Sequence, residues 1–182
     1  MDYFPFPDKV GALQELIQDF HFKNIPKEQI YAIVDDAWEA GVQAAKVILK
    51  RWPVENAETI LWEQKVHVIE VDEDRLIGNM RYFSDYYSGK KEIYLYIKSI
   101  QQWADHHALS LTEAKEIIMF HELFHHLECH EPELVQIHAT IPWIKVGKWS
   151  IGQQKLHAQS EIGAYGFSRT CYESKNLLRK EV

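Results

Sequence analysis

The chain has 182 residues, of which 46% are hydrophobic, and its six Trp and nine Tyr predict one packed globular domain with a sizeable core. The net charge of −7 and the absence of a basic cluster argue against nucleic acid as a partner. Cys129 and Cys171 form no C-x-x-C pattern, so a disulfide framework is not expected and a reducing cytoplasm fits. No apolar run reaches the roughly 18 residues of a membrane span, and residues 1–5 carry no secretory signal pattern. We therefore expect a cytoplasmic protein with no membrane partner.

The first part of the chain, residues 1–52, is predicted to be a helical extension that precedes the main domain of residues 53–182. Residues 8–20 show the pattern of a short amphipathic helix. Pro26 suits the first turn of a longer helix, which we expect to end near Trp52 and Pro53. An apolar stripe supports this helix, formed by Ile30, Ile33, Val34, Ala37, Trp38, Ala45 and Ile48.

The middle of the chain alternates between strand and helix patterns. Three strands are predicted, at residues 66–71, 78–86 and 92–97. Helices are predicted at residues 57–64, 98–107 and 154–180, whereas residues 131–153 contain several Pro and Gly and have no clear period. This pattern predicts an α+β fold in which a small, mainly antiparallel three-stranded sheet is flanked by helices.

A helix over residues 110–129 carries the most informative motif of the chain. Ser110 and Glu113 have the spacing of a capping box, and no Pro or Gly interrupts the following residues. Within this helix, residues 121–125 read His-Glu-Leu-Phe-His, which is the H-E-x-x-H pattern. His121 and His125 are one turn apart and therefore point the same way. Two such imidazoles could ligate one zinc ion, and Glu122 could act as general base on a water beside it.

A catalytic zinc site of this kind needs a third protein ligand and one open position. The metzincin pattern would place Gly at position 128 and His at position 131, but this chain has Glu128 and Glu131. A glutamate from the last helix is the alternative, and Glu161 is the best candidate. Glu128 and His157 are the other candidates for the third ligand.

The segment around Glu161 resembles the E-x-x-A-(Asn/Asp)-x-F element of gluzincin peptidases, because Glu161, Ala164 and Phe167 match it. The order of elements over roughly residues 56–180 also resembles the ImmA/IrrE type of small zinc peptidase. The resemblance implies that residues 53–182 adopt a minimal zincin-like fold and that Glu161 ligates zinc. Tyr165 stands where the family element has Asn or Asp, and Phe124 where a small residue is common.

These features predict a zinc-dependent metallopeptidase that hydrolyses peptide bonds with an activated water. Glu122 is expected to take a proton from that water and to pass it to the leaving amine. The phenol of Tyr165 is a candidate donor to the developing oxyanion, with a buried core tyrosine as the alternative. The polypeptide substrate is expected to pair with a strand edge within residues 78–97, and the resemblance suggests limited proteolysis of a regulatory protein.

Two other functions remain open at this level. The first is a non-catalytic, zinc-stabilised module that binds a partner protein, although a structural site would not need Glu122. The second is a zinc hydrolase of small amides. A long cleft would favour a peptidase, and a closed pocket would favour the hydrolase of small amides. The oligomeric state is left open.

Overall fold

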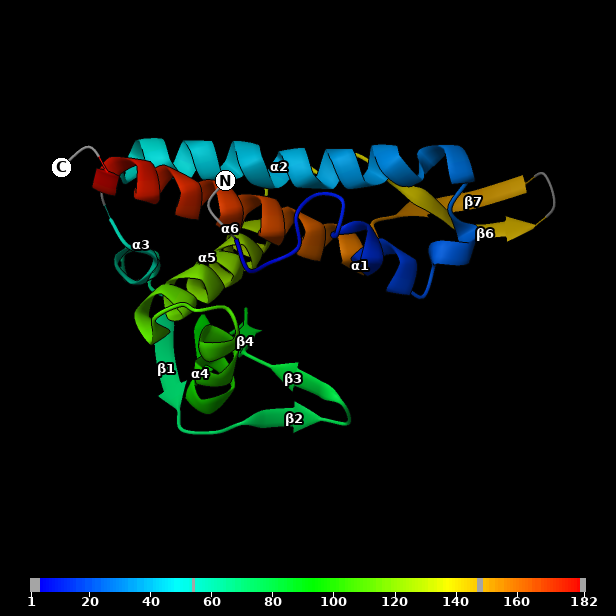
Figure 1. Cartoon of the computed structure of the whole chain (residues 1–182). Coiled ribbons are helices and arrows are strands. Elements are labelled where there is room, and N and C mark those ends of the chain that lie inside the picture. The colour runs from blue at the N-terminus through cyan, green and yellow to red at the C-terminus, as the bar shows by residue number, and fades with distance from the viewer. Residues whose placement is uncertain (1–3, 54, 147–148, 181–182) are drawn as a thin grey trace.

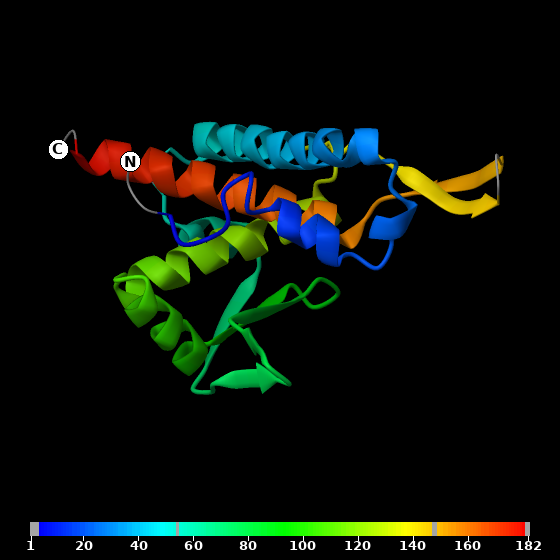
Figure 2. The same ribbon diagram turned by 45° about the vertical axis from the view of Figure 1, so that its right-hand side comes forward.

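The computed structural model describes residues 4–53, 55–146 and 149–180. Most of its helices form layers on one side of a small sheet (Figures 1 and 2). The helices are α1 (Leu13–Gln18), α2 (Ile30–Arg51), α3 (Ala57–Glu63), α4 (Ile97–His106), α5 (Leu111–His130) and α6 (His157–Lys180). The strands are β1 (His67–Val71), β2 (Arg75–Ile77), β3 (Met80–Tyr82), β4 (Ser84–Tyr87), β5 (Glu92–Tyr96), β6 (Ile141–Val146) and β7 (Trp149–Gln154). Helices α2 and α6 lie side by side in the outer layer, and α5 lies between them and the sheet (Figure 1).

The main sheet has the strand order β1-β5-β4, so β4 is one of its edges. Strand β5 pairs in parallel with β1 and antiparallel with β4. Two separate hairpins, β2–β3 and β6–β7, are antiparallel, and β6–β7 projects from the end of the helical layer (Figure 1). The predicted α+β class, with small and mainly antiparallel strand pairings, is confirmed, and the parallel β1–β5 pair is the exception.

Several predicted boundaries differ from those observed. Residues 78–86 were expected to form one strand, but Gly78 adopts φ +61° in the turn between β2 and β3, and the chain pairs as β3 and then β4. The hairpin β6–β7 falls in residues 131–153, where no strand was predicted. Helix α1 begins at Leu13 instead of near residue 8, because Asp8 binds the backbone N–H groups of Gly11 and Ala12 in a preceding turn.

Helices α2 and α6 pack backbone against backbone at two glycines. A Cβ atom added at Gly41 of α2 would overlap the carbonyl group of Gly163 on α6. A Cβ atom at Gly163 would lie 2.5 Å from Cζ of Phe124 on α5. Side chains larger than hydrogen are therefore excluded at both positions unless the helices separate. The contact of Gly163 with Phe124 sets the distance between α6 and α5, the helix that carries the H-E-x-x-H motif.

Helix α5 is fixed at its start by the predicted capping box. The Ser110 Oγ atom accepts a hydrogen bond from the Glu113 N–H at 3.2 Å, and Glu113 Oε2 accepts one from the Ser110 N–H at 3.0 Å. The helix then runs through the core and is buried on more than one face. Its fully buried apolar residues are Ala114, Ile117, Phe120, Leu123, Phe124 and Leu127.

Among the described residues, no helix combines the length and the apolar composition that crossing a membrane requires. Cys129 and Cys171 are both free thiols, with Cys129 exposed and Cys171 buried. Burial raises the pKa of the Cys171 thiol, so this side chain is a neutral member of the core.

Candidate metal centre

Three predicted ligands converge between α5 and α6. His121 Nε2 lies 3.2 Å from Glu161 Oε2, and His125 Nε2 lies 3.5 Å from Glu161 Oε1. The two histidine Nε2 atoms are 3.0 Å apart. All three side chains are partly buried, and together they form a group that could hold a metal ion. The two helices bring a residue at position 161 to the pair at positions 121 and 125, as predicted.

The spacing of these atoms fits a tetrahedral metal ion. Nitrogen and oxygen ligands at about 2.0–2.2 Å from a tetrahedral zinc ion are separated from one another by about 3.3–3.6 Å. The two Nε2 atoms are 3.0 Å apart and lie 3.2 and 3.5 Å from different oxygens of Glu161, Oε2 and Oε1, which is close to this range. One ligand atom from each of the three residues lies within 4.8 Å of the others. Two imidazoles and one carboxylate are also the ligand types of an open, catalytic site. The residues present therefore form a group that could hold a metal ion.

A serine and a second glutamate orient His125 from behind. His125 Nδ1 lies 3.0 Å from Ser160 Oγ, and the Ser160 hydroxyl in turn donates to Glu128 Oε2. If the serine proton is given to Glu128, Ser160 Oγ can accept the Nδ1 proton of His125. This tautomer leaves the lone pair of Nε2 free to face the ligand cluster. Glu128, considered above as a third ligand, thus lies behind His125 and supports it.

His121 is oriented by aromatic rings instead. Its Nδ1 atom is buried and has no hydrogen-bond partner among the described residues. The ring of Tyr165 lies 5.5 Å from the His121 ring, centroid to centroid. The Tyr165 hydroxyl points to α1, where it donates to Glu15 Oε1 at 3.0 Å. Tyr165 therefore reaches the site with its ring, while its predicted role as a hydrogen-bond donor to an oxyanion stays a prediction.

The electrostatics of the cluster favour a positive charge between its members. Burial would raise the pKa of Glu161, but the hydrogen bond and charge of His121, together with His125, lower it to about 2. Burial would lower the pKa of His125, but nearby Glu128, Glu122 and Glu161 outweigh this effect and raise it. Carboxylates that hold a proton on a buried histidine offer the same stabilisation to a bound cation.

Glu122, the predicted general base, lies beside the ligands and is itself buried. Its Oε1 atom accepts a hydrogen bond of 2.5 Å from Ser84 Oγ at the start of β4. A single neutral donor leaves the other carboxylate oxygen available to a water molecule or a leaving group. Ser84 thus fixes Glu122 toward the same side of α5 as the metal ligands.

The ligands open into a cleft of about 860 Å³ between the sheet and the helices. Strand β4 forms one wall, and α5 and α6 form the other. The β2–β3 hairpin and residues 5–7 line its ends. The cleft contains His121, Glu122, His125, Glu161, Tyr165 and His157 among its lining residues. The cleft opens at the edge strand β4, so it has room for an extended chain as well as for a small molecule.

Three other histidines lie outside the ligand group, among them the alternative candidate His157. His157 lines the cleft, whereas His130 Nε2 is 3.3 Å from the Ser88 carbonyl oxygen. His138 is tied to α2 through its backbone N–H, which donates to Asp36. Sequence reasoning missed Ser84 and Ser160, although the position of Ser160 directly before a predicted ligand was an available signal.

A scan against models of known protein families, a search of curated proteins and a search of solved structures found no significant match to this chain.

Proposed function

We propose that the protein is a zinc-dependent metallopeptidase of the gluzincin type, similar to the ImmA/IrrE peptidases, that acts on a polypeptide. One observation carries the proposal: His121, His125 and Glu161 present ligand atoms within 4.8 Å of one another, in an open cleft that also holds Glu122. The free thiols of Cys129 and Cys171 support action in a reducing cytoplasm. The resemblance to the family supports limited proteolysis of a regulatory protein.

In this mechanism His121, His125 and Glu161 would hold the zinc ion in the cleft. Bound zinc supplies Lewis acidity, which polarises a carbonyl group and makes water acidic near neutral pH. Glu122 takes the proton of the attacking water and delivers it to the leaving amine. Ser84 holds Glu122 in position, and Ser160 with Glu128 holds His125.

The edge strand β4 supports a polypeptide as the substrate. Its residues Ser84, Asp85 and Tyr86 line the cleft, and β4 pairs with β5 on one side only among the described strands. An extended chain in the cleft could therefore pair with β4 through main-chain hydrogen bonds. Such pairing would place a peptide bond of the bound chain beside Glu122.

Metal content tests the ligand set. We expect one zinc ion per chain in the purified protein, and its loss in His125→Ala and in Glu161→Ala, because two remaining ligands hold zinc weakly. Mass spectrometry of metals in the freshly purified protein, after dialysis, measures this. Glu133→Ala is the control, since Glu133 is exposed and lies outside the cleft. Full zinc content in Glu161→Ala would remove Glu161 from the ligand set.

Hydrolysis tests the role of Glu122. We expect Glu122→Gln to bind zinc normally and to cleave a pool of quenched fluorescent peptides about 10²–10⁴-fold more slowly, because the amide cannot accept the proton of water. The matched control is Glu133→Gln, which makes the same change on the surface. Cleavage by Glu122→Gln at the wild-type rate would refute the proposed mechanism.

A further inference from the structure

One end of the cleft is filled by an aromatic side chain from the N-terminal segment. The ring of Phe6 lies 5.5 Å from the ring of the ligand His121, 5.1 Å from Trp103 and 5.4 Å from Tyr165, between centroids. Phe83 extends this aromatic group, at 5.3 Å from Trp103. A large apolar side chain is thus seated directly beside the metal centre, in a pocket built from α4, α5 and α6.

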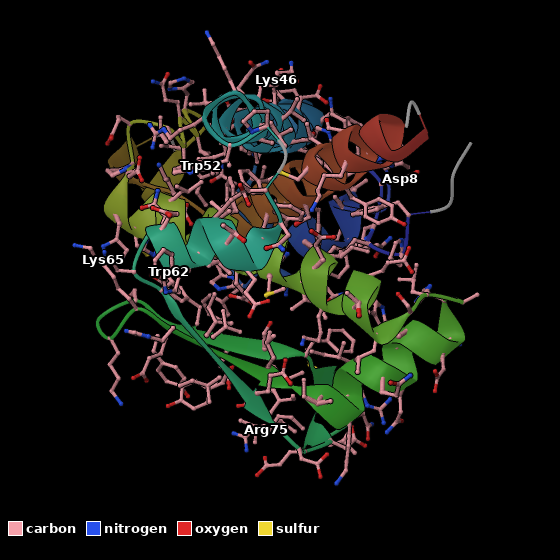
Figure 3. All side chains as sticks on the ribbon, turned by 90° about the vertical axis from the view of Figure 1, so that its left-hand side faces the viewer. Asp8, Lys46, Trp52, Trp62, Lys65 and Arg75 are labelled. Atoms are coloured by element: carbon pink, nitrogen blue, oxygen red, sulfur yellow. The ribbon has the colours of Figure 1, made fainter. Side chains whose placement is uncertain are left out.

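The segment that carries Phe6 is anchored at both of its ends. Phe4 is 9% exposed and packs 5.5 Å from Tyr172, and the guanidinium of Arg169 lies over its ring. At its other end, Asp8, which is labelled in Figure 3, accepts hydrogen bonds from the backbone N–H groups of Gly11 and Ala12 in the turn before α1. Residues 4–7 are therefore held at both ends, residues 5–7 line the cleft, and we call residues 4–7 the strap below.

The strap is held by its rings and scarcely by its main chain. Pro5 and Pro7 have no N–H group to donate. Between described residues, the structure shows no backbone-to-backbone hydrogen bond that involves residues 4–7. Phe6 itself is only half-buried although it contacts three rings. A chain with ordinary N–H groups could pair with β4 in addition to filling the pocket, so it has the means to displace the strap.

We propose that the strap is a built-in competitor of the substrate, and that Phe6 occupies a subsite for an aromatic side chain of a bound polypeptide. The inference rests on the proposed function only in taking a polypeptide as the ligand of the cleft. When such a chain binds, its aromatic side chain replaces Phe6 between Trp103, Tyr165 and His121. The prolines beside Phe6 keep the strap from pairing as a substrate would.

Peptide binding by the full-length protein tests the proposal without hydrolysis. The background is Glu122→Gln, and the probe is dansyl-Ala-Ala-Phe-Ala-Ala-amide, followed by fluorescence anisotropy. We expect Phe6→Ala to bind this peptide with a Kd at least tenfold lower than the same protein with Phe6. The all-alanine peptide should show no such gain. Phe20→Ala is the matched control, because Phe20 is 92% exposed and lies outside the cleft.

Two results would overturn the proposal. Equal affinities with and without Phe6 would show that the ring does not block the subsite. Weaker binding by Phe6→Ala would show that Phe6 is a fixed wall of the subsite and not its occupant. If circular dichroism shows that Phe6→Ala is unfolded, Phe6→Leu takes its place, with an expected gain of about threefold, and no gain in that variant would also refute the strap.

These outcomes are separate from those that decide the proposed function. Zinc content and cleavage by the protein with Glu122 intact report on the metallopeptidase activity. Binding in the Glu122→Gln background reports on the strap alone. A protein without hydrolysis could still show the tenfold gain, and an active peptidase could fail to show it.

Discussion

Two regions beside the metal centre, the packed helices α2 and α6 and the β2–β3 hairpin at the end of the cleft, are each held in place by a different kind of contact. On the helical side, Gly41 and Gly163 bring the backbones of α2 and α6 into direct contact. At the end of the cleft, polar groups hold the β2–β3 hairpin, among them the ion pair of Arg81 Nε with Asp74 Oδ1 at 2.8 Å. The hairpin leaves three apolar side chains 53–63% exposed, those of Leu76, Ile77 and Met80.

The two kinds of contact suit two requirements of the proposed site, which are a fixed spacing of the metal ligands and room for a substrate. Metal ligands must keep their spacing to a few tenths of an ångström, and close-packed helices provide this because they cannot shift without opening voids. A polypeptide substrate needs room and a surface that can adapt to it. Of the three exposed apolar residues of the hairpin, Met80 lines the cleft and offers such a surface.

The largest expected effect comes from a substitution that disrupts the contact between α2 and α6. Gly41→Ala should lower the free energy of unfolding by about 3 kcal/mol, because the new methyl group overlaps the Gly163 carbonyl group and the helices must move apart. Denaturant unfolding of the metal-free protein measures this value. The control is Gly89→Ala, since a Cβ atom at Gly89 meets no atom within 4 Å. Equal stability of the two variants would contradict the close contact.

A smaller effect is expected where the helical side orients a ligand. Ser160→Ala removes the group that links His125 Nδ1 to Glu128, and zinc affinity should fall about 10–100-fold. Competition with a chelator of known affinity measures the change. Ser168→Ala is the matched control on the same helix, because the Ser168 hydroxyl donates to the Ala164 carbonyl oxygen of its own helix. An unchanged affinity in Ser160→Ala would show that the serine does not support the ligand.

The smallest effect concerns the β2–β3 hairpin at the end of the cleft. The hydrogen bond from Arg81, with further ones from Ser99 and Gln102, lowers the pKa of Asp74 from 3.8 to about 2. A lowered pKa in the folded state means that the carboxylate stabilises the fold above about pH 4, and that this contribution is lost as the pH falls toward 2. The difference in Tm between wild type and Asp74→Asn should therefore shrink from pH 5 to pH 2. A constant difference over this range would exclude Asp74 as its source.

The sequence allowed the metal centre to be predicted more fully than the cleft around it. The capping box at Ser110 and the i, i+4 spacing of His121 and His125 are local, so periodicity alone placed both histidines on one face. The addition of Glu161 needed the ligand count of a catalytic zinc site. The residues Ser84 and Phe6 approach the site only through tertiary packing, and their sequence positions carry no period or motif.

The strand boundaries show the same limit. Residues 78–86 have strand character throughout, but only the φ of +61° at Gly78 and the pairing partners divide them into β3 and β4. The parallel pairing of β1 with β5 is likewise a long-range choice, because two strands of equal pattern can pair in either direction. Local propensity predicted the existence of these strands and left their partners open.

Phe124 and Gly163 show how the ligand helices share one volume. Phe124 directly precedes His125, and Gly163 follows Glu161 by two residues, so the contact between them adjoins two metal ligands. The Cζ atom of the Phe124 ring occupies the space that any side chain at position 163 would require. The size that is tolerated at position 124 therefore depends on α6 as well as on α5. The large ring of Phe124 fits because Gly163 has no side chain, so neither residue can be substituted independently of the other.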